Sequence, residues 1–225
     1  MGGSRQYWRD IILGINDGLV SMFLLVAGIV GGGLGREQVL LAGVAGALAG
    51  AVSMGSGEYL ATKSQTEVLS SEIALEETHI KHFRDLEVAQ LYPMLRAVGV
   101  TEDDLPGVVR ALSHDDPTLL NAMKVFEFGV VESENRSPTK AMLMSSGLFL
   151  AGSAPSVVPF LFDLSPHVAL GIAAGASAVA LFAVGVGKTI ITRTNPIVAG
   201  VENLLIAGVG GAIAYIVGRL VGLSV

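Results

Sequence analysis

Cysteine is absent from the sequence, which excludes disulfides, thiolate metal sites and cysteine nucleophiles. Charge is also scarce: only 15% of the 225 residues are charged, fewer than a soluble domain of this length needs to cover its surface. The basic residues form no stripe and the net charge is −6, so we expect no nucleic-acid partner. The Gly-x-x-x-x-Gly-Lys-Ser/Thr motif of ATP-binding loops is missing too, which argues against a pump driven by ATP.

Apolar residues, in contrast, make up 51% of the chain and concentrate in five long stretches. Each stretch is close to the ~20 residues that a helix needs to cross a ~30 Å hydrocarbon core. The five stretches are residues 11–33, 39–61, 141–162, 168–187 and 197–221. Pro155 and Pro159 lie within the third stretch and predict a kink in it. The sequence therefore predicts an all-α membrane protein with five transmembrane helices.

The segment between the second and third stretches differs in character, because it holds most of the acidic residues and all but one of the histidines. Apolar residues at helical spacing extend the second membrane helix into this segment: Ile73, Leu75, Ile80, Phe83, Leu86 and Val88. We expect Pro93 to interrupt this helix and a second helix to begin with a cap in residues 101–104. A third helix is predicted from Thr118 to about residue 131, followed by a linker in residues 133–138.

The chain is therefore predicted to have three parts: transmembrane helices 1 and 2 in residues 1–61, a three-helix cytosolic metal-binding module in residues 62–140, and transmembrane helices 3 to 5 in residues 141–225. Basic residues near helix ends predict the orientation. With a cytosolic N-terminus, the inner ends carry Arg5, Arg9, Lys63, Lys140, Lys188 and Arg193, and the outer ends carry only Arg36 and Arg219. We therefore expect the C-terminus outside, with a prokaryotic plasma membrane favoured over a vacuolar one.

Three carboxylates fall inside the predicted membrane helices, where ionisable groups are costly and usually functional. They are Asp17, Glu58 and Glu202. At ~1.5 Å rise per residue, Asp17, Met54 and Glu202 lie at a similar depth near the cytosolic face, with Glu58 one turn nearer the cytosol. Carboxylate and thioether ligands in one layer suit a partly dehydrated divalent cation, so these four residues form a candidate translocation path. The alternative is that the carboxylates only snorkel to the interface, which Glu58 is shallow enough to do.

The acidic segment contains a second set of candidate metal ligands. Glu72, Glu76 and His79 share one helix face, at spacings of four and three residues. Further pairs at helical spacing complete the set: Glu87, Gln90, Met123 and Glu127. Three helices would thus bring carboxylates, an imidazole and a thioether to bound cations, and the alternative is a solvated acidic face. Only one Glu-x-x-His pair is present, whereas di-iron bundles use two, so a ferroxidase is disfavoured.

Three sequence runs resemble the vacuolar iron transporter family. They are GINDGL at residues 14–19, SMGSGEYLATKS at residues 53–64 and MKVFEFG at residues 123–129. The resemblance covers essentially the whole chain, and it implies a homodimer that exports Fe²⁺ from the cytosol in exchange for protons. It also implies roles for the matching residues: Asp17 and Met54 in the translocation path, and Glu76, Glu87, Met123 and Glu127 in a cytosolic metal-binding domain of three helices.

The chain departs from the plant-type pattern of this family at several positions. His79 and Gln90 stand where that pattern has glutamates, and Lys124 replaces a methionine. In the second span Gly46 replaces a glutamate, while Glu58 appears where plant-type members have glycine. We therefore expect fewer or weaker bound ions in the cytosolic module, and we hypothesise that Glu58 takes over the role of the missing glutamate.

These observations predict a secondary transporter, not an enzyme, that moves Fe²⁺ out of the cytosol against protons. The expected partners are divalent metal ions, protons, the lipid bilayer and a second copy of the chain, with no cofactor besides the bound and transported ions. The ligand types do not separate Fe²⁺ from Mn²⁺, so an exporter of Mn²⁺ or of many divalent metals is one alternative. The other alternative is a membrane-anchored metal sensor or buffer without transport.

Overall fold

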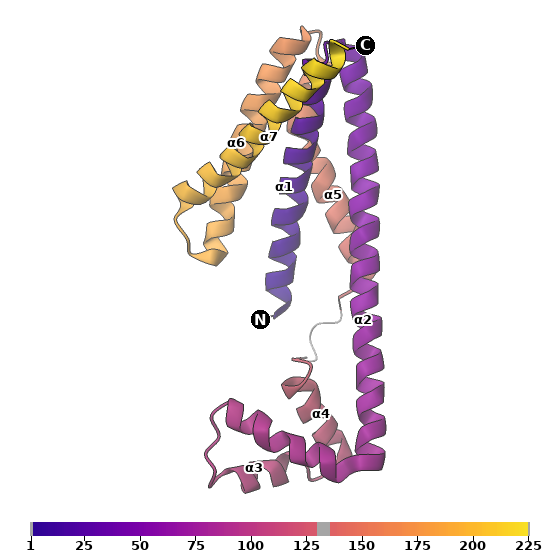
Figure 1. The fold of residues 1–225 in the computed structure, drawn as a ribbon, viewed down its shortest axis with the longest axis vertical. Coiled ribbons are helices and arrows are strands. Elements are labelled where there is room, and N and C mark those ends of the chain that lie inside the picture. Colours follow the sequence, from indigo (N-terminus) through magenta and orange to yellow (C-terminus); the bar gives the residue numbers. More distant parts are fainter. Residues whose placement is uncertain (1, 130–135, 225) are drawn as a thin grey trace. The chain divides into compact units, whose positions relative to one another are not determined.

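A computed structural model describes residues 2–129 and 136–224, and the elements within these ranges are all helical (Figure 1). In chain order they are α1 (Gly2–Gly31), α2 (Arg36–Ala97), α3 (Leu105–Leu112), α4 (Asp116–Phe126), α5 (Pro138–Val157), the short 3-10 helix η1 (Val158–Leu161), α6 (Pro166–Thr192) and α7 (Pro196–Gly222). Five helical segments in these ranges are long and apolar enough to cross a membrane: α1, α2, α5 with η1, α6 and α7. The predicted all-α architecture is therefore confirmed for the described residues, with five candidate transmembrane helices.

The chain divides into two compact units, and α2 contributes to both. The first unit, called the membrane unit below, comprises Gly3–Leu60 and Pro138–Val225. The second, called the acidic unit, comprises Ala61–Ser137. The location of the acidic unit in the cytosol stays a prediction.

Glycines let helix backbones touch inside the membrane unit. A Cβ atom added to Gly18 of α1 would lie less than 3.0 Å from the carbonyl oxygen of Phe149 in α5, and one added to Gly152 would meet the carbonyl oxygen of Ile15 in the same way. The backbones of α1 and α7 approach as closely, because a Cβ on Gly218 would collide with the backbone of α1. Without a hydrophobic driving force between helices in lipid, such close packing is the main source of helix association.

Prolines mark the helix boundaries of the membrane unit. Pro138, Pro166 and Pro196 begin α5, α6 and α7, where the missing N–H has no helical partner to lose. At the end of the third span the structure refines the predicted kink: α5 passes through Pro155 and ends at Val157. The tighter 3-10 turn of η1 follows and contains Pro159. The predicted span of residues 141–162 is thus an α-helix that changes type in its last turn.

The prediction that Pro93 interrupts the helix in the acidic unit is wrong. The helix continues through Pro93 to Ala97, and its break lies at Phe83, whose backbone is non-helical with φ −135° and ψ 35°. Proline removes a hydrogen bond to the carbonyl four residues earlier, here Ala89. Ala89 is exposed, so water can satisfy that carbonyl, and the helix tolerates the proline.

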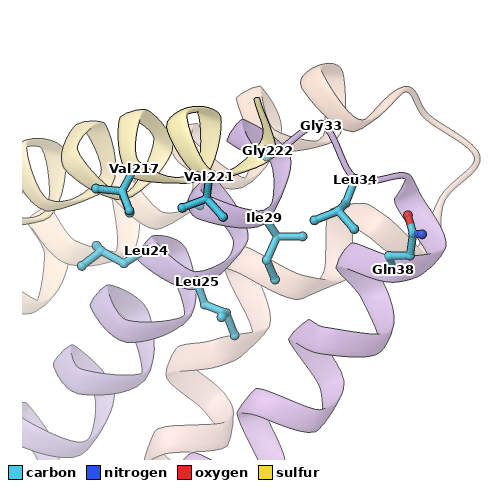
Figure 2. Close-up of a pocket in the computed structure, with 13 residues that line it drawn as sticks. Leu24, Leu25, Ile29, Gly33, Leu34, Gln38, Val217, Val221 and Gly222 are labelled. Carbon is cyan, nitrogen blue, oxygen red and sulfur yellow. The ribbon is translucent and has the colours of Figure 1, made fainter. Parts of the chain in front are cut away.

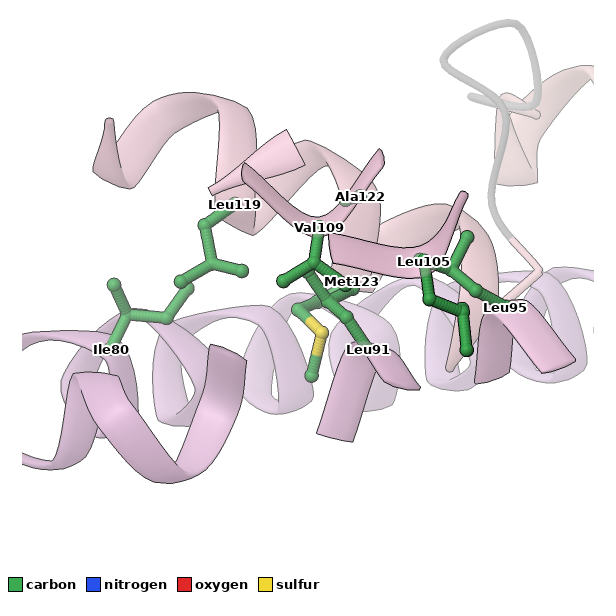
Figure 3. Close-up of a cluster of buried hydrophobic side chains, with 8 residues drawn as sticks. All are labelled: Ile80, Leu91, Leu95, Leu105, Val109, Leu119, Ala122 and Met123. Atoms are coloured by element: carbon green, nitrogen blue, oxygen red, sulfur yellow. The ribbon is translucent and has the colours of Figure 1, made fainter. Parts of the chain in front are cut away.

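The core of the acidic unit joins both parts of α2 to α3 and α4 (Figure 3). Its buried members are Ile80, Leu91, Leu95, Leu105, Val109, Leu119, Ala122 and Met123. Of the apolar residues that predicted the extended helix, Leu75, Phe83 and Leu86 are exposed. For Leu86 this follows from the break at Phe83, which resets the helical phase of the residues after it. α4 ends at Phe126, before the predicted end near residue 131. Residue 131 and residues 133–135 of the predicted linker lie outside the described residues.

Candidate metal centre

Glu76, His79 and Glu87 form the cluster with the geometry of a metal site within the described ranges. Each offers a ligand atom, and these atoms all lie within 4.8 Å of one another. His79 Nδ1 is 3.6 Å from Glu87 Oε1 and 3.9 Å from Glu76 Oε2. We call these three residues the triad.

The break in α2 is what brings the triad together. In a straight helix Glu76 and Glu87 would be separated by about 16 Å along the axis, at ~1.5 Å per residue. The non-helical backbone of Phe83 lies between them in sequence and turns the second part of α2, so that both carboxylates reach His79. The local backbone change therefore creates the cluster.

Both carboxylates of the triad are buried, which is expensive unless a partner compensates their charge. Glu76 is 5% exposed and Glu87 is 4% exposed. Glu76 Oε1 is buried and has no hydrogen-bond partner among the described residues. Burial, followed by the negative charges of Glu87 and Glu127, raises the pKa of the Glu76 carboxyl to about 7. A divalent cation would replace the proton of Glu76 and supply the compensating charge.

The remaining candidate ligands of the acidic unit have different surroundings. Gln90 donates a hydrogen bond from Nε2 to Glu87 Oε2, at 2.7 Å. Met123 is fully buried in the apolar core shown in Figure 3. Glu127 caps the end of α4 and is exposed, but its charge acts on Glu76. Glu72 lies one turn before Glu76 and is exposed.

The four candidate path residues of the membrane unit each have a neighbour of their own. Asp17 accepts a hydrogen bond from Ser21 Oγ at 2.8 Å. Met54 packs against an apolar cluster that includes Met22 and Phe149. Glu58 forms an ion pair with Arg9, in which Oε1 lies 3.9 Å from Nη2. Glu202 forms an ion pair with Lys188, in which Oε2 lies 3.2 Å from Nζ. A joint role of the four residues in translocation stays a prediction.

Sequence reasoning missed Asp10, whose side chain is 1% exposed inside the membrane unit. Arg9 connects it to Glu58, because Arg9 Nη2 is 3.4 Å from Asp10 Oδ1 and also faces Glu58. The available signal was its position seven residues before Asp17, which places both aspartates on one face of α1. Asn203 is a second such residue: it donates to Asn16 Oδ1 at 3.4 Å and to the carbonyl of Leu181 at 3.3 Å, and so connects α7 to α1 and α6.

A large cavity of about 780 Å³ lies within the membrane unit, between α1, the start of α2 and α7 (Figure 2). Its lining is formed by glycines and aliphatic side chains such as Leu25, Ile29 and Val221. Gln38 is its polar lining residue. Such an apolar surface offers a metal ion almost no ligands, so the triad and not this cavity is the candidate metal centre.

Comparisons with known proteins connect this geometry to a family. The family model described as the VIT family matches residues 8–219. Vacuolar iron transporter 1 of Arabidopsis thaliana is 32% identical over 216 residues, covering 95% of this chain and 85% of the relative. Vacuolar iron transporter 1 of Oryza sativa subsp. japonica is 30% identical over 212 residues, covering 94% and 84%, and the vacuolar iron transporter of Toxoplasma gondii is 28% identical over 231 residues, covering 99% and 76%. The chain belongs to the VIT family.

Proposed function

We propose that this protein moves Fe²⁺ out of the cytosol in exchange for protons. Membership of the VIT family and the names of its relatives support metal ion transport across a membrane. The observation that carries the proposal further is the triad, in which a buried carboxylate oxygen of Glu76 has no partner among the described residues. Carboxylate and imidazole ligands together bind Fe²⁺ readily.

Protons and cations compete for the same carboxylates in this proposal. With its pKa raised to about 7, Glu76 is partly protonated at neutral pH, and an arriving Fe²⁺ displaces that proton. The ion then moves through the membrane unit along Asp17 and Met54. Protons travel the other way in exchange and neutralise the carboxylates that the ion leaves.

The remaining elements of the proposal come from the charge pattern and the family resemblance. The N-terminus lies in the cytosol and the C-terminus outside, as the distribution of basic residues predicts. The protein acts as a homodimer in a prokaryotic plasma membrane. Glu58 serves as the membrane glutamate that is missing at Gly46.

Proteoliposomes under an imposed pH gradient test the proposal. We expect wild-type protein to accumulate Fe²⁺, and Asp17→Ala to lose gradient-dependent flux while still binding metal in the acidic unit. Asp163→Ala is the matched control, because the Asp163 side chain is fully exposed beside Arg36 at the end of the third span, and it should transport at the wild-type rate. Mn²⁺ added as a competitor distinguishes an iron exporter from a broad exporter. Metal binding without flux in wild-type protein would instead identify a sensor or buffer.

A further inference from the structure

His79 supplies the nitrogen donor of the triad, and it does so between two carboxylates. Its Nδ1 atom faces Glu87 Oε1 at 3.6 Å and Glu76 Oε2 at 3.9 Å. The His79 side chain is 42% exposed, whereas both glutamates are buried, so the imidazole forms the open side of the cluster. The imidazole is therefore the ligand of the triad that solvent reaches most easily.

Gln90 holds one oxygen of Glu87 and leaves the other for the cluster. Its amide nitrogen donates to Glu87 Oε2 at 2.7 Å, while Glu87 Oε1 faces His79. An ionised carboxylate only accepts hydrogen bonds, so the NH₂ group of the amide and not its oxygen faces Glu87. Gln90 is thus placed to orient Glu87, and its own role as a ligand stays a prediction.

We propose that His79 makes this centre selective for borderline transition metals of the Fe²⁺ and Zn²⁺ class over Mn²⁺, Mg²⁺ and Ca²⁺, with Gln90 as the residue that positions Glu87. This inference rests on the proposed function and names the class of ion that the centre takes. The buried oxygen of Glu76 has no hydrogen-bond partner among the described residues, so a bound cation would compensate the cost of burying it. Fe²⁺ and Mn²⁺ both accept carboxylate and imidazole, so His79 does not exclude Mn²⁺. An imidazole in place of an oxygen ligand instead shifts the ratio of affinities toward Fe²⁺ and Zn²⁺ and away from Mn²⁺, Mg²⁺ and Ca²⁺.

Competition between Co²⁺ and Mn²⁺ on the purified full-length protein tests the selectivity. Co²⁺ stands in for Fe²⁺ because it resists oxidation in air, and its visible absorption reports nitrogen coordination. We expect His79→Glu to reduce the ratio of Co²⁺ to Mn²⁺ affinity by about 10-fold or more, and to remove the nitrogen signature. Gln90→Ala is expected to weaken both metals by roughly 10-fold with their order unchanged, as removal of outer-shell partners does. Glu77→Gln is the control, because Glu77 is an exposed carboxylate beside Glu76, and it should leave both quantities unchanged.

The outcomes separate this inference from the proposed function. An unchanged affinity ratio in His79→Glu would overturn the inference, while Fe²⁺ flux in proteoliposomes would still support transport. Wild-type protein that binds neither metal would overturn the inference and also remove the triad from the proposed function. If His79→Glu does not fold, as judged by its elution on gel filtration, His79→Gln replaces it, since the amide also removes the nitrogen ligand. The same fall in ratio is then expected, and its absence is equally decisive.

Discussion

Replacing Glu76 by glutamine is expected to stabilise the acidic unit of the metal-free protein at neutral and higher pH, although it removes a candidate ligand. Burial and the neighbouring carboxylates raise the pKa of Glu76 from 4.5 to about 7. The folded protein therefore holds this proton more tightly than the unfolded chain does. The contribution of the protonated Glu76 to the free energy of unfolding is therefore fully present below about pH 4.5, and it is lost as the pH rises through 7.

The size of the effect follows from the shift. Each pKa unit corresponds to about 1.4 kcal/mol, so ionising Glu76 in the folded state costs roughly 3 kcal/mol by pH 8. The full rise in pKa from 4.5 to about 7 corresponds to an increase of about 300-fold in local opening of the acidic unit. Glutamine does not ionise, so this cost is absent in the variant at every pH. Its NH₂ group can also donate a hydrogen bond to the Glu87 carboxylate. Hydrogen exchange of peptides from α3 and α4, measured on full-length protein from pH 5 to 8 and corrected for intrinsic rates, reports this opening.

The comparison of wild-type protein with Glu76→Gln has a matched control and one result that would refute it. Glu77→Gln removes an adjacent exposed charge and should keep the wild-type pH dependence. Added Co²⁺ should restore protection at pH 8 in wild-type protein but not in Glu76→Gln. If wild-type protein and Glu76→Gln lose protection equally between pH 5 and 8, the assignment of this ionisation cost to Glu76 is refuted.

Three further predictions concern packing and capping. Gly152→Ala should destabilise the membrane unit by about 1–3 kcal/mol and lower the melting temperature, because the added Cβ would meet the backbone of α1. Gly147→Ala in the same helix is the control: its Cβ meets open space, so it should not lower the melting temperature. Leu91→Ala should cost about 2–5 kcal/mol in hydrogen-exchange stability of the acidic unit, since Leu91 is fully buried, and Leu86→Ala, at an exposed position, should cost far less. Asp115→Ala should speed exchange at the start of α4, because the Asp115 side chain accepts the Thr118 N–H; exchange that stays unchanged there would exclude a capping role.

Hydropathy alone predicted the five membrane helices because a bilayer demands length and apolarity, and both are local properties of the sequence. The start of α4 was predicted at Thr118 and lies two residues earlier, at Asp116, where Asp115 is the cap and Pro117 a first-turn proline. The break at Phe83 was not predictable, because phenylalanine has no backbone preference for such a conformation. Pro93 is the stronger local signal of a break, yet its exposed surroundings let the helix continue.

In the candidate site, too, the features set by local spacing were predictable, and those set by tertiary packing were not. Glu76 and His79 could be paired from their spacing on one helix, and both belong to the triad. Glu87 was a candidate by residue type, but its approach to Glu76 depends on the break that the sequence did not reveal. The contact of Gln90 with Glu87, the pairing of Glu202 with Lys188 and the burial of Asp10 all depend on tertiary packing, which helical periodicity does not report.

The bend of α2 also affects how the protein is made. All three candidate ligands lie within residues 76–87, so the chain needs to close only a very short loop to bring them together. Contacts so local in sequence form quickly and do not wait for the later membrane helices. The ligand cluster can therefore assemble while α5, α6 and α7 are still being synthesised, before a complete membrane unit exists to receive an ion.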